Sequence, residues 1–167
     1  KLKELVYLYA RRNSMSFNLD FLKAGKLNNL FALWLDGNEV TGTIPTEIGQ
    51  LTGLASLSIT NSTELSGPIP TEIGKLTDLR RLWLYNNALS GAIPTELSEL
   101  PKLEVLELQN NNLEGEIPTT VCANILTQTY IHKALIVDCG KVECPLGTCC
   151  TKCGDDNANS QNGNLAN

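Results

Sequence analysis

The residues with the most obvious capacity for covalent chemistry are six cysteines near the end of the chain. All of them fall after residue 121, in the segment VCANILTQTYIHKALIVDCGKVECPLGTCCTKC. Cysteines clustered in so short a segment are typical of a disulfide framework in an oxidising compartment. We therefore predict disulfide bonds for the following residues: Cys122, Cys139, Cys144, Cys149, Cys150 and Cys153.

The pairing of these cysteines stays open at the level of sequence, because six cysteines allow many connectivities. Cys149 and Cys150 are adjacent and would be strained as partners, so each is expected to reach a different cysteine. Zinc binding is the alternative, since Cys150 and Cys153 have the spacing of metal ligands. No second well-spaced pair follows, and the one histidine, His132, lies well upstream. We therefore predict no metal and no cofactor.

Groups suited to catalysis are scarce. Nucleophilic triads and most acid-base schemes need an oriented histidine or paired carboxylates in a cleft. The one histidine lies in the cysteine-rich segment, near Asp138, and is expected to be exposed there. The sequence predicts a protein that is not an enzyme.

A second group of residues suits molecular recognition. Trp34 and Trp83, the two tryptophans, occupy the same position of two similar phrases, ALWLDGN and RLWLYNN. Tryptophan, tyrosine and arginine dominate protein interfaces, and aromatic rings also stack on sugars. Related positions carry more residues of these kinds and two carboxylates: Tyr7, Tyr9, Arg11, Asp36, Arg81, Tyr85 and Glu107.

A repeat of 24 or 25 residues positions these side chains. Four consecutive units span residues 27–50, 51–75, 76–99 and 100–124, and residues 2–26 keep the leucine spacing without the Gly-x-Ile-Pro half. The alternating Leu-x-Leu of each unit predicts a short strand with one buried face. Asn38, Asn87 and Asn111 end these strands, where amide side chains can satisfy backbone groups of the turn.

The phrase Ile-Pro-Thr-Glu recurs on what should be the opposite side of each unit. Thr46, Thr71 and Thr95 are expected to cap a short turn that the following glutamates support. A regular row of threonines could instead match an ice lattice, and a row of glutamates could hold calcium. Because Thr119 is followed by Thr120 and the neighbouring column (Thr43, Pro68, Ala92, Glu116) is irregular, we favour the capping role.

With the form LxxLxxLxLxxNxLSGxIPxxI, residues 2–124 resemble the plant-type leucine-rich repeats. The resemblance implies an α/β repeat solenoid, a right-handed arc with a short parallel β-sheet on its concave face. The cysteine-rich end is similar to that of secreted leucine-rich repeat proteins from diatoms and related algae. A disulfide-stapled C-terminal cap is expected there, because the last repeat has no neighbour to cover its apolar edge.

Stacking of such units places equivalent positions in columns across the concave sheet. The central column reads Tyr9, Trp34, Ser58, Trp83 and Glu107, so both tryptophans share it. We predict that they face solvent, where an aromatic gains little from folding unless a partner covers it. The alternative is that the two rings shield each other across the gap at Ser58 and bind nothing.

The predicted organisation has four parts: a degenerate first repeat at 1–26, four leucine-rich repeats at 27–124, a cysteine-rich cap at 125–154 and a polar tail or linker at 155–167.

The net charge is −5 and no basic stripe appears, which argues against a nucleic-acid partner. No apolar run is long enough for membrane insertion. A chain that opens at Lys1 within the repeat spacing is expected of a processed or trimmed product. Asn61 begins the one glycosylation acceptor sequence, at a bulged strand end where the second unit has its extra residue.

These features predict a secreted or extracellular protein, or one in another oxidising compartment such as an organelle lumen. The predicted function is a non-catalytic binding module that recognises a protein or polysaccharide ligand through the concave face. An inhibitor of a secreted hydrolase is an alternative, suggested by a resemblance to plant polygalacturonase inhibitors. A structural subunit of a larger assembly is another, and the residues alone do not choose among the three.

Thiol titration tests the disulfide prediction. The denatured, unreduced protein should show no free thiol, because every cysteine is expected to be paired. Reduction should then release all six thiols. Six free thiols before reduction, together with bound zinc, would contradict the prediction.

Overall fold

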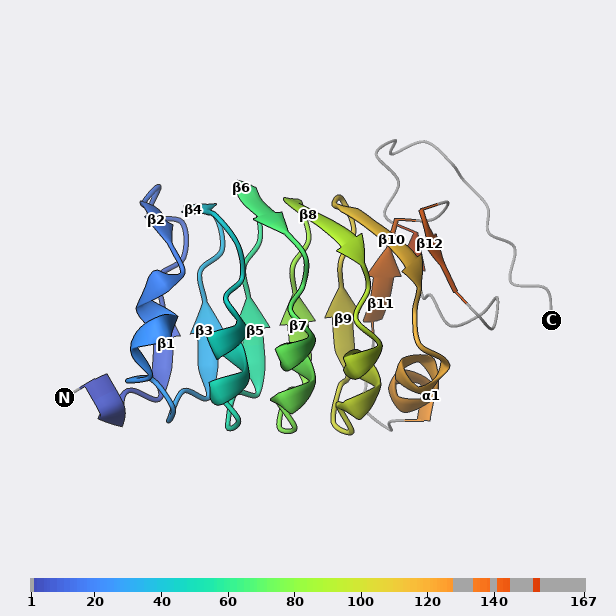
Figure 1. Ribbon diagram of the computed structural model, residues 1–167, viewed down its shortest axis with the longest axis horizontal. Helices are drawn as coiled ribbons and strands as arrows, with labels where there is room; N and C mark the ends of the chain where they lie inside the picture. The colour runs from blue at the N-terminus through green and yellow to red at the C-terminus, as the bar shows by residue number, and fades with distance from the viewer. Residues whose placement is uncertain (1, 128–133, 139–140, 145–151, 154–167) are drawn as a thin grey trace.

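The structure is a computed structural model that describes residues 2–127, 134–138, 141–144 and 152–153. The chain winds through successive turns that lie side by side, and each turn adds one strand to a common sheet (Figure 1). This inner sheet is parallel and runs in the order β1-β3-β5-β7-β9-β11-β13. Its strands are β1 (Tyr7–Tyr9), β3 (Ala32–Trp34), β5 (Ser56–Ser58), β7 (Arg81–Trp83), β9 (Val105–Glu107), β11 (Ala134–Val137) and β13 (Lys152–Cys153).

The register of the inner sheet confirms the predicted columns. Leu33 pairs with Leu57 and Leu57 with Leu82, and all three are fully buried. The flanking residues of each strand stand on the other face, since successive side chains of a strand alternate. The repeat therefore brings residues about 25 positions apart next to one another on that exposed face.

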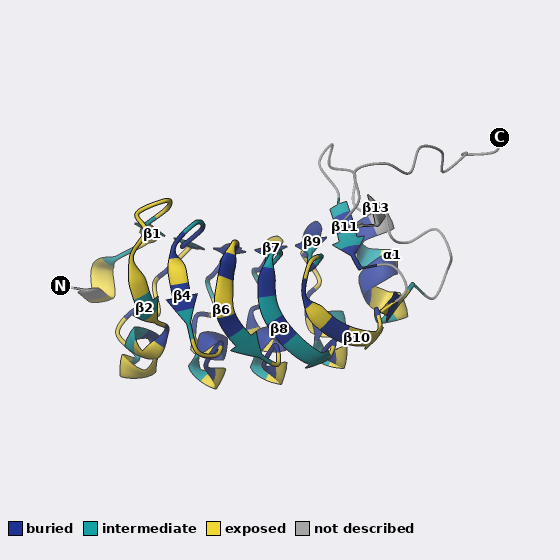
Figure 2. Ribbon diagram, turned by 90° about the horizontal axis from the view of Figure 1, so that it is seen from above, coloured by how far each residue is buried: buried dark blue, intermediate teal, exposed yellow. Residues whose placement is uncertain are grey.

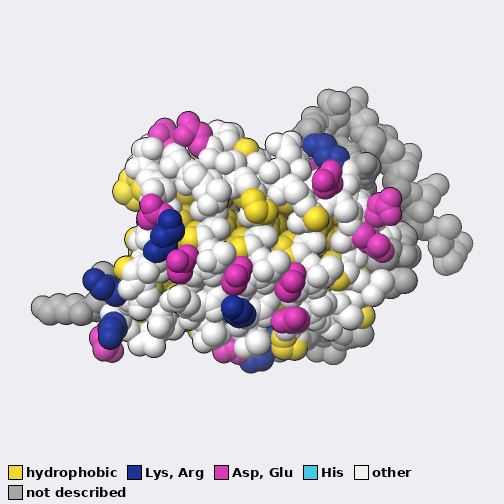
Figure 3. Space-filling view, viewed as in Figure 1, with side chains coloured by type: hydrophobic (Ala, Val, Ile, Leu, Met, Phe, Trp, Pro, Cys, Tyr) yellow, Lys and Arg dark blue, Asp and Glu magenta, His cyan; other side chains and the backbone are white. Residues whose placement is uncertain are grey.

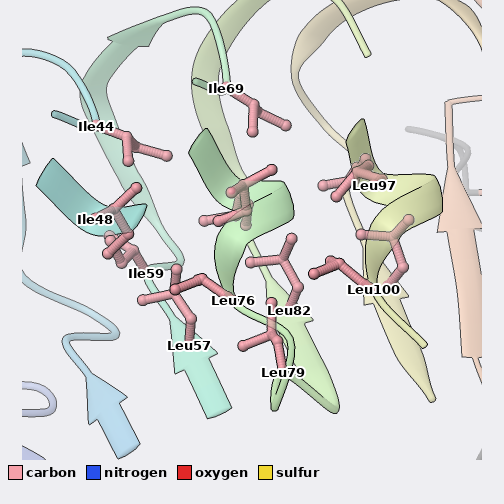
Figure 4. Packing of buried hydrophobic residues seen from close by; sticks show 14 of the residues in the cluster. Ile44, Ile48, Leu57, Ile59, Ile69, Leu76, Leu79, Leu82, Leu97 and Leu100 are labelled. Carbon is pink, nitrogen blue, oxygen red and sulfur yellow. The ribbon is translucent and has the colours of Figure 1, made fainter. Parts of the chain in front are cut away.

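The opposite side of each unit carries a short helix. Five 3-10 helices and one α-helix are found among the described residues: η1 (Leu2–Glu4), η2 (Asp20–Ala24), η3 (Thr46–Gln50), η4 (Thr71–Lys75), η5 (Thr95–Glu99) and α1 (Thr119–Thr127). Between the helices and the inner sheet, leucine and isoleucine side chains such as Ile48, Leu57 and Leu76 pack as one continuous core (Figure 4). Each unit thus buries its apolar residues against its neighbours.

The predicted capping role of the threonines is wrong. The N-cap positions of η3, η4 and η5 are Pro45, Pro70 and Pro94, and no side chain caps these helices. Proline suits the N-cap position because its ring fixes φ in the extended conformation found there, and because it has no backbone N–H group that could remain unpaired. The threonine hydroxyl comes next in the chain and lies 3.4 Å from the carboxylate of the following glutamate.

A second set of strands, which the sequence did not predict, joins the inner sheet to the helices. One sheet runs in the order β12-β10-β8-β6, and β2 pairs with β4; a bridge between Gly42 and Leu65 connects the two sheets. The strands are β2 (Ser16–Asn18), β4 (Glu39–Thr41), β6 (Ser62–Gly67), β8 (Asn87–Ala92), β10 (Asn112–Glu116) and β12 (Val142–Glu143). Buried residues alternate with less buried ones along β8 (Figure 2). The predicted bulge in the second unit is confirmed by a register shift between Ser62 and Ser66.

Buried asparagines hold the turn that leaves each inner strand. Asn87 donates from its amide nitrogen to the carbonyls of Ile59 (2.8 Å) and Leu84 (2.7 Å), and its amide oxygen accepts from the Ser62 backbone (2.9 Å). Asn38 and Asn111 make the same kinds of bonds within their own unit and to the preceding one. The predicted asparagine ladder is therefore confirmed.

Two other residues complete the ladder. Ser62 takes the asparagine position of the second unit and donates its hydroxyl to the Asn38 carbonyl at 2.9 Å. Beyond the last repeat, the carboxylate of Asp138 accepts from the backbone of Asn110 (2.7 Å) and Asn111 (3.1 Å). At the end of the array, the carboxylate of Asp138 thus accepts the backbone bonds that an asparagine amide oxygen accepts in the other units.

Close packing of the outer helices requires glycine at one position. A Cβ on Gly74 would lie 2.7 Å from the carbonyl oxygen of Glu96 in the next unit, and Gly49 meets Glu72 in the same way at 2.8 Å. Both distances are shorter than a carbon and an oxygen tolerate. Ser98 takes this position in the third unit, where the neighbouring fourth unit carries α1 on its outer side instead of another 3-10 helix.

Only part of the cysteine-rich segment is described. Cys122 is buried in α1, Cys144 packs against the core, and neither is a free cysteine. Cys139, Cys149, Cys150, the side chain of Cys153, and the tail predicted at 155–167 lie outside the described residues. Within the part of the chain that the structure covers, no helix is long and apolar enough to cross a membrane.

Replacing Asn87 by alanine should lower the free energy of unfolding by about 1–3 kcal/mol, because buried backbone groups at Ile59, Ser62 and Leu84 lose their partner. Denaturant unfolding followed by circular dichroism measures this change. Asn112→Ala is the matched control, since Asn112 is exposed and its side chain makes no hydrogen bond among the described residues. Equal stability of the two variants would argue against the structural role of the ladder.

Candidate binding site on the inner face

The exposed side of the inner sheet, which we call the inner face, carries a hollow of about 290 Å³. It extends across the strands from β3 to β9, which lie in the middle of the array (Figure 1). We call it the binding hollow, and its lining residues are Arg11, Trp34, Asp36, Ser58, Trp83, Tyr85 and Glu107. All of these except Ser58 are among the predicted binding residues, so the fold brings most of the predicted set together.

Short side chains on β5 create the hollow. Trp34, Ser58 and Trp83 lie in register on three neighbouring strands. Because serine is short, the two indole rings approach each other over β5, with centroids 6.4 Å apart and planes at 81°. In this edge-to-face contact the two rings shield each other, as the alternative interpretation expects, and the contact leaves space beside the rings.

A row of aromatic rings leads from the first strand to the binding hollow. The ring of Tyr9 lies 4.6 Å from that of Trp34, and Tyr7 lies 5.8 Å from both Tyr9 and Phe31. The indole nitrogen of Trp34 also donates to the Ser56 hydroxyl at 2.7 Å. Both tryptophans are consequently half-buried, less open to solvent than predicted.

Not every predicted residue lies in the hollow. Tyr7 and Tyr9 are 52% and 53% exposed and extend the aromatic row toward the N-terminal edge. Arg81 is exposed on β7 and does not line the hollow. Sequence reasoning missed Phe31, which precedes its strand and lies outside the columns, although it is 47% exposed.

Asp36 is the polar centre of the hollow. Its carboxylate accepts hydrogen bonds from the hydroxyls of Ser58 and Thr60, the latter at 3.1 Å, and pairs with the Arg11 guanidinium at 2.8 Å. The residue is only 7% exposed. A carboxylate this buried needs such partners, so Asp36 organises the floor of the hollow as well as lining it.

Arg11 contributes a second contact in addition to its ion pair. Its guanidinium carbon lies 5.3 Å from the centroid of the Trp34 ring, within the range of a cation–π interaction. The part of the hollow that Arg11, Trp34 and Asp36 line, its first half, therefore contains a guanidinium, an aromatic ring and a carboxylate in mutual contact.

Asparagines form a second row along the rim of the inner face. Asn61, Asn86 and Asn110 all have positive φ angles, between 56° and 59°, which asparagine tolerates well. The Asn86 amide donates to Asn61 at 2.8 Å, and the Asn110 amide donates to Asn86 at 2.6 Å. Asn61 is exposed, as a glycosylation acceptor must be.

The described residues offer no alternative site for a metal. No group of three or more His, Cys, Asp or Glu side chains that could hold an ion occurs among them. His132 lies outside the described residues. On the face seen in Figure 3, the described lysines and arginines are scattered among acidic side chains and form no basic stripe.

Comparison with known proteins agrees with the architecture. Residues 29–51, 78–100 and 102–124 match the Leucine Rich Repeat family model. No curated protein matches the chain. The repeats and the parallel sheets are therefore those of a leucine-rich repeat solenoid.

Solved structures with the same fold include plant receptors. The plant peptide hormone receptor RGFR1, solved in complex with RGF2, is 38% identical with a TM-score of 0.71 over 82% of this chain and 22% of the receptor. The Arabidopsis receptor kinase HAESA, solved with the peptide hormone IDA and the co-receptor SERK1, is 30% identical with a TM-score of 0.67 over 81% of this chain and 23% of that one.

A plant ice-binding protein is also similar. It is 32% identical, with a TM-score of 0.62 over 82% of this chain and 42% of that protein. The chain thus spans less than half the length of each of these three relatives.

Replacing Asp36 by alanine should destabilise the protein by about 2 kcal/mol, since two hydroxyls and a guanidinium lose their buried acceptor. Thermal or denaturant unfolding measures the loss. Asp78→Ala is the control, because its pair with Lys102 is about half exposed on both sides and should change stability by at most about 0.5 kcal/mol. If the two variants were equally stable, Asp36 would have no structural role in the hollow.

Proposed function

We propose that this chain is a non-catalytic binding module that takes a segment of a protein partner on its inner face. The observation that carries the proposal is the binding hollow, in which two tryptophans and a tyrosine stand beside charged groups on a rigid sheet. Aromatic and arginine side chains in a partly desolvated hollow are the usual centres of protein recognition. At about 290 Å³, the hollow has room for one or two side chains of a partner.

A peptide or protein ligand is favoured by the structural relatives. Two of them were solved with peptide hormones, and one of these also with a co-receptor. A polysaccharide remains the alternative ligand, because the aromatic row of Tyr7, Tyr9 and Trp34 could stack on sugar rings. The charged lining of the hollow supports the peptide.

The proposal concerns the module alone. The chain spans only 22% and 23% of the two receptors, so the activities of those whole proteins are not transferred to it. A repeat scaffold fixes the shape of the surface, while a few variable residues determine the ligand.

An extracellular location, a disulfide-stapled cap and a glycan on Asn61 belong to the same proposal. The relatives that are plant receptors support the location, and the absence of a free thiol at Cys122 and Cys144 supports the cap. Asn61 is exposed on the rim of the inner face, so a glycan there would extend from that rim.

The two other functions differ in what they require. An inhibitor of a secreted hydrolase would also use the inner face, and it would abolish the activity of its target at a one-to-one ratio. A structural subunit would bury a flank or the cap and would not persist as a monomer in solution.

Ice binding gains little support from the outer side. Thr46, Thr71 and Thr95 are exposed, but each hydroxyl lies 3.4 Å from a glutamate carboxylate. Ionised carboxylates hold their own water shell, so a row of them disrupts a surface that must match ice.

Replacing Trp83 by alanine should weaken binding to a cognate peptide or protein by about 30-fold or more, because the hollow loses its central ring. Screening against extracellular peptides, secreted proteins and oligosaccharides, followed by calorimetry on the best ligand, measures the effect. Phe31→Ala serves as control, since Phe31 is an exposed aromatic outside the hollow. A ligand that binds the Trp83 variant with full affinity would show that recognition occurs elsewhere.

A further inference from the structure

The two halves of the binding hollow have similar composition but differ in one respect. In the first half, the Trp34 ring and the Asp36 carboxylate hold the guanidinium of Arg11. In the second half, the Trp83 ring stands next to the Glu107 carboxylate, in register on the neighbouring strand. Tyr85 adds a second ring to this half. An aromatic ring and a carboxylate are therefore present twice.

The described residues of the second half include no cation that pairs with its carboxylate. Among the residues that the structure describes, no lysine or arginine forms an ion pair with Glu107, and its carboxylate makes no hydrogen bond. Arg81 is on the same strand as Trp83, but it does not line the hollow. Glu107 is half-buried, so its charge is only partly screened by water.

The charges of the hollow follow from these contacts. Its charged lining residues are Arg11, Asp36 and Glu107, one positive and two negative. Arg11 is already neutralised by Asp36, so among the described residues the uncompensated charge is the one on Glu107. The hollow is therefore electrostatically complementary to a cation and not to an anion.

We propose, on the premise that the inner face is a binding surface, that the ligand is a peptide segment that presents an arginine side chain to Trp83, Tyr85 and Glu107. The guanidinium pairs with the Glu107 carboxylate and lies against the aromatic rings, as Arg11 does with Asp36 and Trp34. Arginine suits this position better than lysine, because its planar guanidinium stacks on a ring while donating to a carboxylate.

Three acetylated and amidated pentapeptides test the proposal, each with four glycines around a central arginine, citrulline or glutamate. Citrulline has the shape of arginine without its charge. Titration is followed by tryptophan fluorescence and checked by calorimetry. The arginine peptide should give a saturable change that the other two do not give.

A substitution tests the role of the carboxylate. Glu107→Gln keeps the shape of the side chain and should weaken binding of the arginine peptide about tenfold. Glu96→Gln, a half-buried carboxylate on η5 on the outer side, is the matched control and should leave the affinity unchanged.

The outcomes separate this proposal from the one on which it rests. Equal binding of the arginine and citrulline peptides, or full affinity in Glu107→Gln, overturns the cation site. Preferential binding of the glutamate peptide that is lost in Trp83→Ala overturns it as well, while the inner face keeps its binding function. If none of the three peptides binds, the cation site is overturned, and the wider ligand screen decides about the inner face.

Discussion

The structure depends on the hydrogen bonds that the backbone makes where the chain leaves each inner strand. At that point the chain turns, and some of its backbone groups, such as the carbonyls of Ile59 and Leu84 and the amide of Ser62, bond to a side chain of the ladder. Asn38, Asn87 and Asn111 provide such partners within their own unit and to the preceding one. Because an unpaired buried polar group is costly, this bonding couples the units and holds their strands in one register.

That register is what allowed much of the fold to be predicted. The positions of Leu33, Leu57 and Leu82 sufficed to place the inner strands and their columns, since strand periodicity and repeat length together determine which side chains meet. The second set of strands escaped prediction because the residues of β8, NALSGA, lack the apolar alternation of an ordinary strand. These strands form because stacking places extended segments of neighbouring units side by side, so their backbones can hydrogen-bond. This pairing is a property of the array and not of the local sequence.

The candidate site was predicted in composition but not in detail. Trp34, Trp83, Tyr85 and Glu107 could be assigned to one face from their columns. The burial of Asp36 could not be predicted, because its carboxylate is stabilised by the hydroxyls of Ser58 and Thr60, and nothing in the sequence marks these two residues as its partners. Likewise, the stacking of Arg11 on Trp34 depends on a side-chain conformation that repeat spacing leaves free.

The two tryptophans lie two strands apart, with the short residues of β5 between them. In a stacked array each unit contacts only its neighbours, so a unit can be added or removed without disturbing the more distant ones. A unit added between Trp34 and Trp83 would move the rings one strand further apart and abolish their contact, and the loss of the β5 unit would close the space between them. An added unit after β9 would do neither. The hollow therefore restricts where this array can change its length in evolution, even though every unit is built on the same plan.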